Sequence, residues 1–204
     1  MNPMQAPKPI TPKRNAKTWG MVHLTIREVR RLFDAAKSNA RDALLLRILY
    51  RAGLRRSEIG MLRVSDLDLD HGTIQVRRLK GSTSNVIPLG ADAVIIAREW
   101  LRIRPTETMA LFPSRQHGPL CGRQVYEIVR KYGAIAKIDD SKLFAHALKS
   151  TVATHMIEAG IPIHDVSANI GHKDIATTAK YYLHVIDPSR LAAVEKLYKR
   201  GGLA

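Results

Sequence analysis

Residues 64–78 read VSDLDLDHGTIQVRR, and residues 80–90 read KGSTSNVIPLG. Apolar and polar residues alternate in the first stretch, break at Asp70-His71-Gly72 and alternate again, which predicts two strands joined by a tight turn. The second stretch adds another turn and a third short strand. The flanking segments instead show the apolar spacing of helices. The sequence therefore predicts an α+β fold, mainly α-helical, with one small three-stranded antiparallel sheet.

Three helices are expected before the sheet. Thr25 and Glu28 match a capping box, in which each side chain bonds the backbone N–H of the other residue. The second helix, ARDALLLRILYRAG at 40–53, is apolar almost all round, so we expect it to be buried and to end at Gly53. A short third helix is expected in RSEIGML at 56–62. The helices expected after the sheet are 91–103, 122–137, 148–159, 162–170, 174–184 and 188–200.

The charge of the chain indicates a polyanionic partner. Its 204 residues include 33 Lys and Arg against 18 Asp and Glu, a net charge of +15. An excess of this size is typical of proteins that bind nucleic acid. Residues 1–20 hold four prolines, four cations and no acid, a composition that cannot form a packed core. We expect a flexible basic tail over 1–20 and one folded domain over 21–204.

The rest of the composition favours a cytoplasmic protein. Cys121 is the single cysteine, so the sequence contains no disulfide framework and a reducing compartment is expected. Nothing approaches the roughly 20 apolar residues needed to cross a bilayer. The basic N-terminus lacks the apolar core of a secretion signal. No membrane partner is expected.

Several metal and nucleotide sites are excluded by their residue patterns. DLDLDHG at 66–72 resembles a calcium loop, but His71 stands where glycine is needed and Arg77 where the last carboxylate is needed. We interpret these acids as the solvent face of a strand. Five of the eight histidines fall between 146 and 184, without an HExxH motif or an accompanying acid cluster. A glycine-rich GxxxxGK[ST] loop is also absent. No metal and no cofactor is expected.

Six residues together match what metal-free chemistry on a DNA phosphodiester requires. Such chemistry needs a side-chain nucleophile, cations placed around the phosphate, and groups that move protons. A tyrosine nucleophile has an unperturbed pKa near ~10, so nearby positive charge helps it to ionise. The candidate catalytic residues, in chain order, are Arg55, Lys80, His146, Lys149, His172 and Tyr181.

The order and spacing of these residues resemble the tyrosine recombinases, also called phage-type integrases. The matching pieces are GLRRSE at 53–58, KGS at 80–82, HALKS at 146–150, GH at 171–172 and TTAKYY at 177–182. Each piece is a weak signal alone, and their joint order is a strong one. The resemblance covers about residues 21–190 and implies a tyrosine-recombinase catalytic domain acting on double-stranded DNA.

The resemblance also implies a role for each residue. Tyr181, nine residues after His172, would attack the scissile phosphate and form a 3′-phosphotyrosyl link. Arg55 would hold the non-bridging oxygens through its two-pronged guanidinium, with Glu58 supporting it. Lys80 would give a proton to the leaving 5′-hydroxyl. His146 and His172 would stabilise the phosphate and assist proton movement. Cofactors are not implied.

This sequence departs from the family pattern in two ways. Lys149 replaces the second arginine of the family, and Ser150 replaces the histidine that follows it. Lysine keeps the charge but lacks the planar fork that binds two phosphate oxygens. The second departure is length, because only the short tail precedes the catalytic domain. In size the chain is similar to the small recombinases of fimbrial phase variation, although a truncated two-domain enzyme stays open.

The DNA-contact residues are expected on basic surfaces and on one helix. The start of the helix in CGRQVYEIVRKYG would read bases, with its later cations nearer phosphates; a solvated helix face is the alternative. The predicted DNA-binding residues are Arg56, Arg77, Arg78, Arg123, Gln124, Arg130 and Lys131, with Arg63 and the tail cations as further phosphate contacts.

Three functions stay open at this point. The leading interpretation is a site-specific recombinase that carries out integration, excision or inversion. The alternatives are a DNA-binding regulator with a decayed active site and a relaxing enzyme of the type IB topoisomerase kind. The resemblance implies a homotetramer on DNA. The apolar side of the helix at 186–204 is expected to pack on its own domain or, as the resemblance implies, to dock in trans on a neighbour. An accessory DNA-binding protein, and a bacterial, phage or mobile-element origin, would fit this interpretation.

Overall fold

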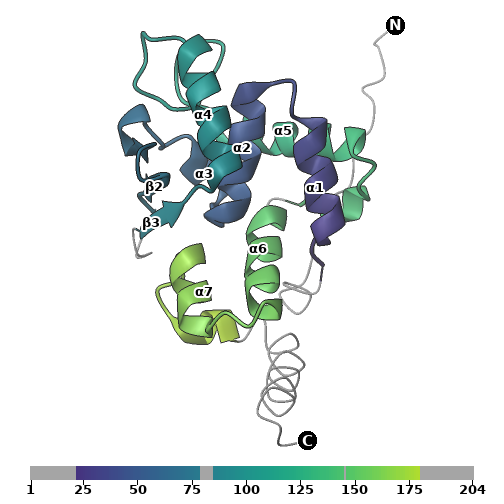
Figure 1. The fold of residues 1–204 in the computed structure, drawn as a ribbon. Helices are drawn as coiled ribbons and strands as arrows, with labels where there is room; N and C mark the ends of the chain where they lie inside the picture. Colours follow the sequence, from purple (N-terminus) through teal and green to yellow (C-terminus); the bar gives the residue numbers. More distant parts are fainter. Residues whose placement is uncertain (1–21, 79–84, 145, 180–204) are drawn as a thin grey trace, which may run out of the picture.

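A computed structural model shows a mainly helical domain with one small sheet (Figure 1). It describes residues 22–78, 85–144 and 146–179. The helices are α1 Ile26–Ala35, α2 Ala40–Arg51, α3 Arg56–Ile59, α4 Ala91–Ile103, α5 Gly122–Ile135, α6 Ala147–Glu158 and α7 Ile163–Ile170. The strands are β1 Leu67–Asp68, β2 Thr73–Val76 and β3 Asn85–Pro88, and 3₁₀ turns lie at Val64–Asp66 and Asp140–Lys142. The predicted fold class is confirmed.

The helix starts follow the expected local chemistry. The hydroxyl of Thr25 accepts from the N–H of Glu28 at 3.2 Å, and the Glu28 carboxylate accepts from the N–H of Thr25 at 2.7 Å, which completes the capping box of α1. Helix α2 is buried along most of its length and ends at Arg51. Gly53 follows with a φ of +52°, a left-handed conformation that glycine adopts without steric cost.

The sheet is antiparallel in the order β1-β2-β3. Ile74 pairs with Leu67 on one side and with Ile87 on the other. Contrary to the expectation from alternation, the acids of the first hairpin do not all face solvent. Asp66 is buried, accepts from the N–H of Arg63 at 2.8 Å and pairs with Arg77 at 2.9 Å. This correction has a local cause, since Asp66 belongs to a 3₁₀ turn rather than to the alternating strand.

The elements form two neighbouring groups that meet at α6. Helix α2 packs on α4 and on α6, α1 and α3 both contact α5, and α7 lies against α6 and β3. In Figure 1, α6 and α7 lie below the group formed by α1 to α5 and the sheet. The large core surrounds α2, and a smaller apolar cluster joins α6 to α7. The active-site candidates described below lie along this junction.

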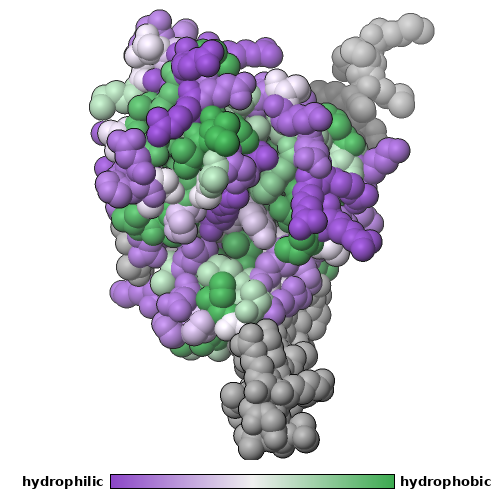
Figure 2. All heavy atoms as spheres, in the orientation of Figure 1, coloured by the Kyte–Doolittle hydropathy of each residue, from purple (hydrophilic) through white to green (hydrophobic). Residues whose placement is uncertain are grey.

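The outer surface is strongly polar in places. Hydrophilic side chains cover the exposed face of α1, at the right of Figure 2, where Arg27, Arg30 and Arg31 are exposed. Among the described residues, no helix is both long and apolar enough to span a membrane. The predicted tail 1–20, most of helix 174–184 and the helix 188–200 lie outside the described residues; within them, residues 175–179 are helical.

Candidate active site

Arg55 sits at the N-terminal end of α3 and is held by Glu58. The N–H of Arg55 donates to Glu58 Oε2, and its guanidinium Nη1 donates to Oε1, both at 2.8 Å. The Glu58 side chain is fully buried, whereas the Arg55 side chain keeps 34% of its surface exposed. One carboxylate thus fixes both the backbone and the side chain of Arg55, while part of that side chain stays exposed.

Arg78 is a correction to the expected DNA surface. Its side chain is fully buried, so it does not present its charge to DNA. Its guanidinium lies 3.6 Å from Glu58, and its nitrogens donate to backbone carbonyls on two segments that are distant in sequence. These carbonyls belong to Ala52 (2.6 Å), Gly53 (3.4 Å), Ile170 (3.0 Å) and Asn169.

The Arg78 bonds therefore join the loop before Arg55 to the end of α7, just before His172. The side chain passes beside Gly171, where a Cβ atom would overlap with it. The sequence analysis did not predict that Arg78 is buried and joins two segments, although the alternation along β2 indicates an inward side chain at this position. Strand alternation buries Ile74 and Val76 and continues inward to position 78.

Lys149 is a buried cation in the first half of α6. Only 2% of its surface is exposed, and its Nζ donates to the carbonyl of Ile170. Burial, reinforced by the charges of Arg55 and Arg78, lowers the pKa of Lys149 to about 7, while Glu58 opposes the shift. The ammonium is consequently easy to deprotonate, and a phosphate placed beside it would raise its pKa again.

His146 occupies the N-cap position of α6, three residues before Lys149, without a capping hydrogen bond from its side chain. Burial lowers the pKa of His146, and the charges of Lys149, Arg55 and Arg56 lower it further. Like Lys149, the imidazole of His146 is thus in a buried setting near the charge of Arg55, which disfavours its protonated form.

His172 follows Gly171, which ends α7 with a φ of +68°. Its N–H donates to Ser167 O at 2.9 Å, and its Nδ1 lies 2.9 Å from the hydroxyl of buried Thr178. Burial lowers the pKa of His172 to about 4, helped by Lys149, Arg55 and Arg78. The ring is neutral at pH 7 and is oriented by Thr178, a residue that the sequence analysis did not single out.

Lys80 and Tyr181 lie outside the described residues, but the segments leading to them are described. Asn85, which pairs with Val76 at the base of the hairpin containing Lys80, donates from Nδ2 to Ala168 O in α7. The His172–Thr178 bond lies three residues before Tyr181. Both segments are thus anchored to the end of α7, next to Arg55, Lys149 and His172.

The arrangement suits the binding of one phosphate group. Arg55, His146, Lys149 and His172 come from three different segments, and the charges of Arg55 and Lys149 act on both histidines. Glu58 balances part of this charge from inside the domain. Preplaced cations and neutral imidazoles in a largely buried site can stabilise a phosphate whose negative charge increases in the transition state.

The surface candidates for DNA contact divide into paired and stacked side chains. Arg123 is 86% exposed and pairs with Glu127 at 2.9 Å, and Gln124 Oε1 accepts from the N–H of Cys121. Arg56 and Arg130 both lie over the ring of Tyr126.

The other surface candidates have partners of their own. Arg130 also pairs with Asp140 at 2.7 Å, Lys131 lies over the ring of Tyr132, and Arg77 holds Asp66 while its side chain stays half-exposed. Apart from Arg78, the predicted contacts that the structure describes are at least partly accessible.

Known proteins similar to this chain identify its family. The Phage integrase family matches residues 23–188. A tyrosine recombinase of Pseudothermotoga lettingae is 31% identical over 85% of this chain and 60% of its own length. Tyrosine recombinase XerA of Thermococcus kodakarensis is 33% identical over 83% of this chain and 60% of its own length. The chain thus spans about 60% of the length of these curated relatives.

Solved structures show the same fold. A crystal structure of XerA recombinase superposes with a TM-score of 0.73 at 27% identity, covering 88% of this chain and 65% of that one. XerH site-specific recombinase, bound to its difH substrate before cleavage, gives a TM-score of 0.68 at 25% identity over 78% of this chain and 50% of that one. With the family match covering most of the sequence, this chain belongs to the phage integrase family.

Proposed function

We propose that this chain is the catalytic domain of a site-specific tyrosine recombinase that cuts and rejoins double-stranded DNA without metal or ATP. The observation that carries this proposal is the convergence of Arg55, His146, Lys149 and His172 at the junction of α3, α6 and α7. Membership of the phage integrase family supports it, as do relatives that are themselves named tyrosine recombinases.

The proposed cleavage step exchanges one phosphoester for another. The Oη atom of Tyr181 forms a bond to phosphorus, the bond from phosphorus to the 5′-oxygen breaks, and Lys80 gives the leaving oxygen its proton. Arg55 binds two non-bridging oxygens, and Lys149 supplies a second charge from one point. The phosphotyrosyl bond keeps the energy of the broken bond, so a 5′-hydroxyl can reverse the step and rejoin the strand.

The neutral histidines suit proton movement during this exchange. His172 has a pKa of about 4, so at pH 7 its ring has a lone pair that can accept a proton. The hydroxyl of Thr178 lies 2.9 Å from Nδ1, which leaves Nε2 as the nitrogen for proton exchange in this proposal. In this proposal His172 and His146 receive and return the proton of Tyr181 near the phosphate.

Covalent capture tests the proposal with DNA of any sequence, so no target site has to be chosen. The full chain is incubated with a pool of random duplexes containing nicks, which let the cut end diffuse away and trap the adduct. Protein-linked DNA is then recovered under denaturing conditions. We expect a covalent adduct with the native chain and none with Tyr181→Phe, which should still bind DNA. Adduct formation by Tyr181→Phe would contradict the assignment of the nucleophile.

The same covalent-capture experiment distinguishes two alternative functions from the proposed one. A DNA-binding regulator with a decayed site has Lys149 and Ser150 as its only support, and it would bind DNA with no adduct. A relaxing enzyme of the type IB topoisomerase kind would form the adduct and relax supercoils without exchanging strands. Plasmids carrying two captured sites separate the two enzymes, since a recombinase inverts, excises or integrates the segment between them.

Assembly on DNA is part of the proposal. We expect a homotetramer on double-stranded DNA in the cytoplasm, with the basic tail 1–20 adding phosphate contacts and an accessory DNA-binding protein adding affinity. XerH, bound to difH DNA, supports DNA as the partner. We also propose that residues 186–204 dock in trans on a neighbouring subunit. Deletion of residues 187–204 would then abolish assembly on DNA, and unchanged assembly would argue against docking.

A further inference from the structure

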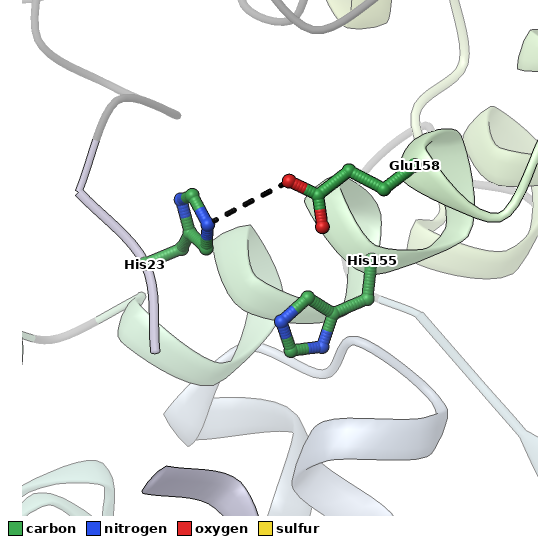
Figure 3. A group of neighbouring side chains, drawn as sticks. All are labelled: His23, His155 and Glu158. Atoms are coloured by element: carbon green, nitrogen blue, oxygen red, sulfur yellow. Dashed lines mark ion pairs between the residues drawn. The ribbon is translucent and has the colours of Figure 1, made fainter. Parts of the chain in front are cut away.

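Three side chains that the proposed function does not use lie close together where α6 meets the segment before α1. His155 and Glu158 belong to this helix, and His23 belongs to the segment just before α1 (Figure 3). One potential ligand atom from each residue lies within 4.8 Å of those of the other two. Two imidazoles and a carboxylate form a ligand set that suits zinc and related divalent ions.

The positions of these residues are set by the fold. His155 and Glu158 are three residues apart on α6, so their side chains lie on the same face of the helix. Next to His23, the N–H of buried Leu24 donates to the hydroxyl of Thr151 at 3.1 Å. That bond brings the segment before α1 against α6, and the rings of His23 and His155 meet edge to face, with 6.0 Å between their centroids.

The hydrogen bonds are compatible with metal binding. The hydroxyl of Tyr50 lies 2.9 Å from Nδ1 of His155, so it can orient the ring while Nε2 serves as the ligand. Metal-binding histidines are commonly oriented in this way by a partner on the second nitrogen. His23 has a buried Nδ1 with no hydrogen-bond partner, and its Nε2 lies 4.0 Å from Glu158 Oε1.

The carboxylate of Glu158 lies beside the two imidazoles and would attract a metal ion. The ring of His155 also forms a hydrogen bond to the backbone of Leu24. A metal ion would take the place of the Leu24 bond and gain the attraction of the carboxylate.

The histidines of the active site have the opposite preference. The charges of Lys149 and Arg55 act on both His146 and His172 and would repel a metal ion. A divalent ion added to the protein should therefore bind at His23, His155 and Glu158 rather than at the active site.

We propose that His23, His155 and Glu158 bind a divalent transition-metal ion, with Zn²⁺ as the best fit, and that the ion attaches the segment before α1 to α6. Ligand distances of about 2.0–2.2 Å place neighbouring ligand atoms roughly 3.3 Å apart. The ligand atoms, now within 4.8 Å of one another, therefore approach by up to about 1.5 Å around the ion. The Glu158 side chain is half-exposed and has the freedom to move. The fourth position is left to water.

Zinc titration of the full-length protein tests the site. After treatment with a chelator, the protein competes with a chromophoric zinc indicator, and thermal unfolding is measured with and without the ion. We expect one tight zinc equivalent, a higher melting temperature, and no such effects from Mg²⁺, which prefers oxygen ligands. His23→Ala and Glu158→Gln should each weaken zinc binding at least tenfold. His155 is left intact because its ring also contacts Tyr50.

A matched control comes from α7. His164 lies 3.2 Å from Asp165, and both are exposed, so His164→Ala removes an imidazole beside a carboxylate elsewhere on the surface. This variant should bind zinc as the native chain does. The proposal is overturned if zinc does not bind, if His23→Ala and Glu158→Gln bind it normally, or if His146→Ala is the variant that loses it. None of these readouts depends on DNA cleavage.

Discussion

Gly171 makes room for the side chain of Arg78. A Cβ atom on Gly171 would overlap with Cδ and Nε of Arg78, and the backbone at Gly171 has a φ of +68°. The glycine thus serves two needs, the left-handed end of α7 and the passage of the guanidinium toward the carbonyls that it binds. Gly171 immediately precedes His172, so this packing bears directly on the active site.

Gly171→Ala should destabilise the domain by about 2–4 kcal/mol, because overpacking adds to left-handed strain. Gly160 is a matched control, since its φ is +77° and an added Cβ would meet nothing within 4 Å. Gly160→Ala should cost only about 1–2 kcal/mol. Urea unfolding measures both variants, and equal losses would show that the contact with Arg78 has no energetic effect.

Lys149 should make DNA affinity depend on pH. Its pKa is about 7 in the free protein, and a bound phosphate raises it, so binding above pH 7 takes up a proton. Affinity for double-stranded DNA at constant salt should fall by up to about tenfold per pH unit above pH 7. Lys149→Arg should remove this dependence because arginine stays protonated. The same slope in both proteins would contradict the prediction.

Lys149 should also make the stability of the domain depend on pH. Stability should rise as the pH rises, whereas DNA affinity should fall. Between pH 7 and about 10 the unfolded chain keeps its lysine protonated, whereas folded Lys149 has lost its proton. The unfolded state then binds more protons, so the free energy of unfolding rises with pH across this window. Lys149→Met should lack this rise. Urea unfolding of both proteins at pH 7 and pH 9.5 measures the difference.

Thr178 should act on cleavage through His172. Thr178→Val removes the hydroxyl that lies 2.9 Å from Nδ1 of His172 while it keeps the side-chain shape. We expect adduct formation to slow by about three- to tenfold, the effect of one hydrogen bond, with DNA affinity unchanged. The neighbouring Thr177 is exposed, so Thr177→Val is the control. Equal rates of adduct formation in the two variants would show that Thr178 does not contribute to cleavage.

Arg55 and Arg56 are neighbours with different expected effects. Arg55→Lys replaces the fork that Glu58 orients and should slow adduct formation about 100-fold or more. Arg56→Ala removes an exposed cation and should reduce the slope of log affinity against log salt concentration by about one. The rate of adduct formation at saturating DNA should stay unchanged. A normal rate in Arg55→Lys would exclude its role at the phosphate.

Arg123 tests sequence recognition. If it reads a base from the start of α5, Arg123→Ala should lose about 1–3 kcal/mol of discrimination at one position of the captured DNA sites. Arg98 on α4 is also more than half exposed, and it pairs with Asp70, so Arg98→Ala is the control. Sequencing of the DNA selected by each variant measures the preference. An unchanged preference in Arg123→Ala would assign α5 to phosphate contacts or to solvent.

Much of the fold could be predicted because local signals agree with it. Alternation indicated the sheet, the capping box marked the start of α1, and the expected helix 91–103 has the bounds of α4. Interactions between distant segments could not be predicted in this way. Nothing near Arg78 in the sequence indicates the carbonyls of Asn169 and Ile170, because their position depends on the packing of α7 against β3.

The active site likewise combines residues that the sequence predicted with contacts that it could not predict. Motif order selected Arg55, His146, Lys149 and His172, which the structure brings into one electrostatic group. The depth of Lys149 was not predicted, since helix periodicity cannot distinguish a cation at a surface from one enclosed by α7. The proximity of His23 to His155 was also missed, because it depends on the path of the chain before α1.

The carbonyl bonds of Arg78 also limit how this domain can change over evolutionary time. One side chain depends on the backbone path of two distant segments, so a substitution at any of the three alters what the other two tolerate. Chimeras that exchange residues 147–179 with a relative should therefore fold well only when the residue at position 78 comes from the same parent. Epistasis of this kind keeps the hairpin and the end of α7 together as one heritable unit.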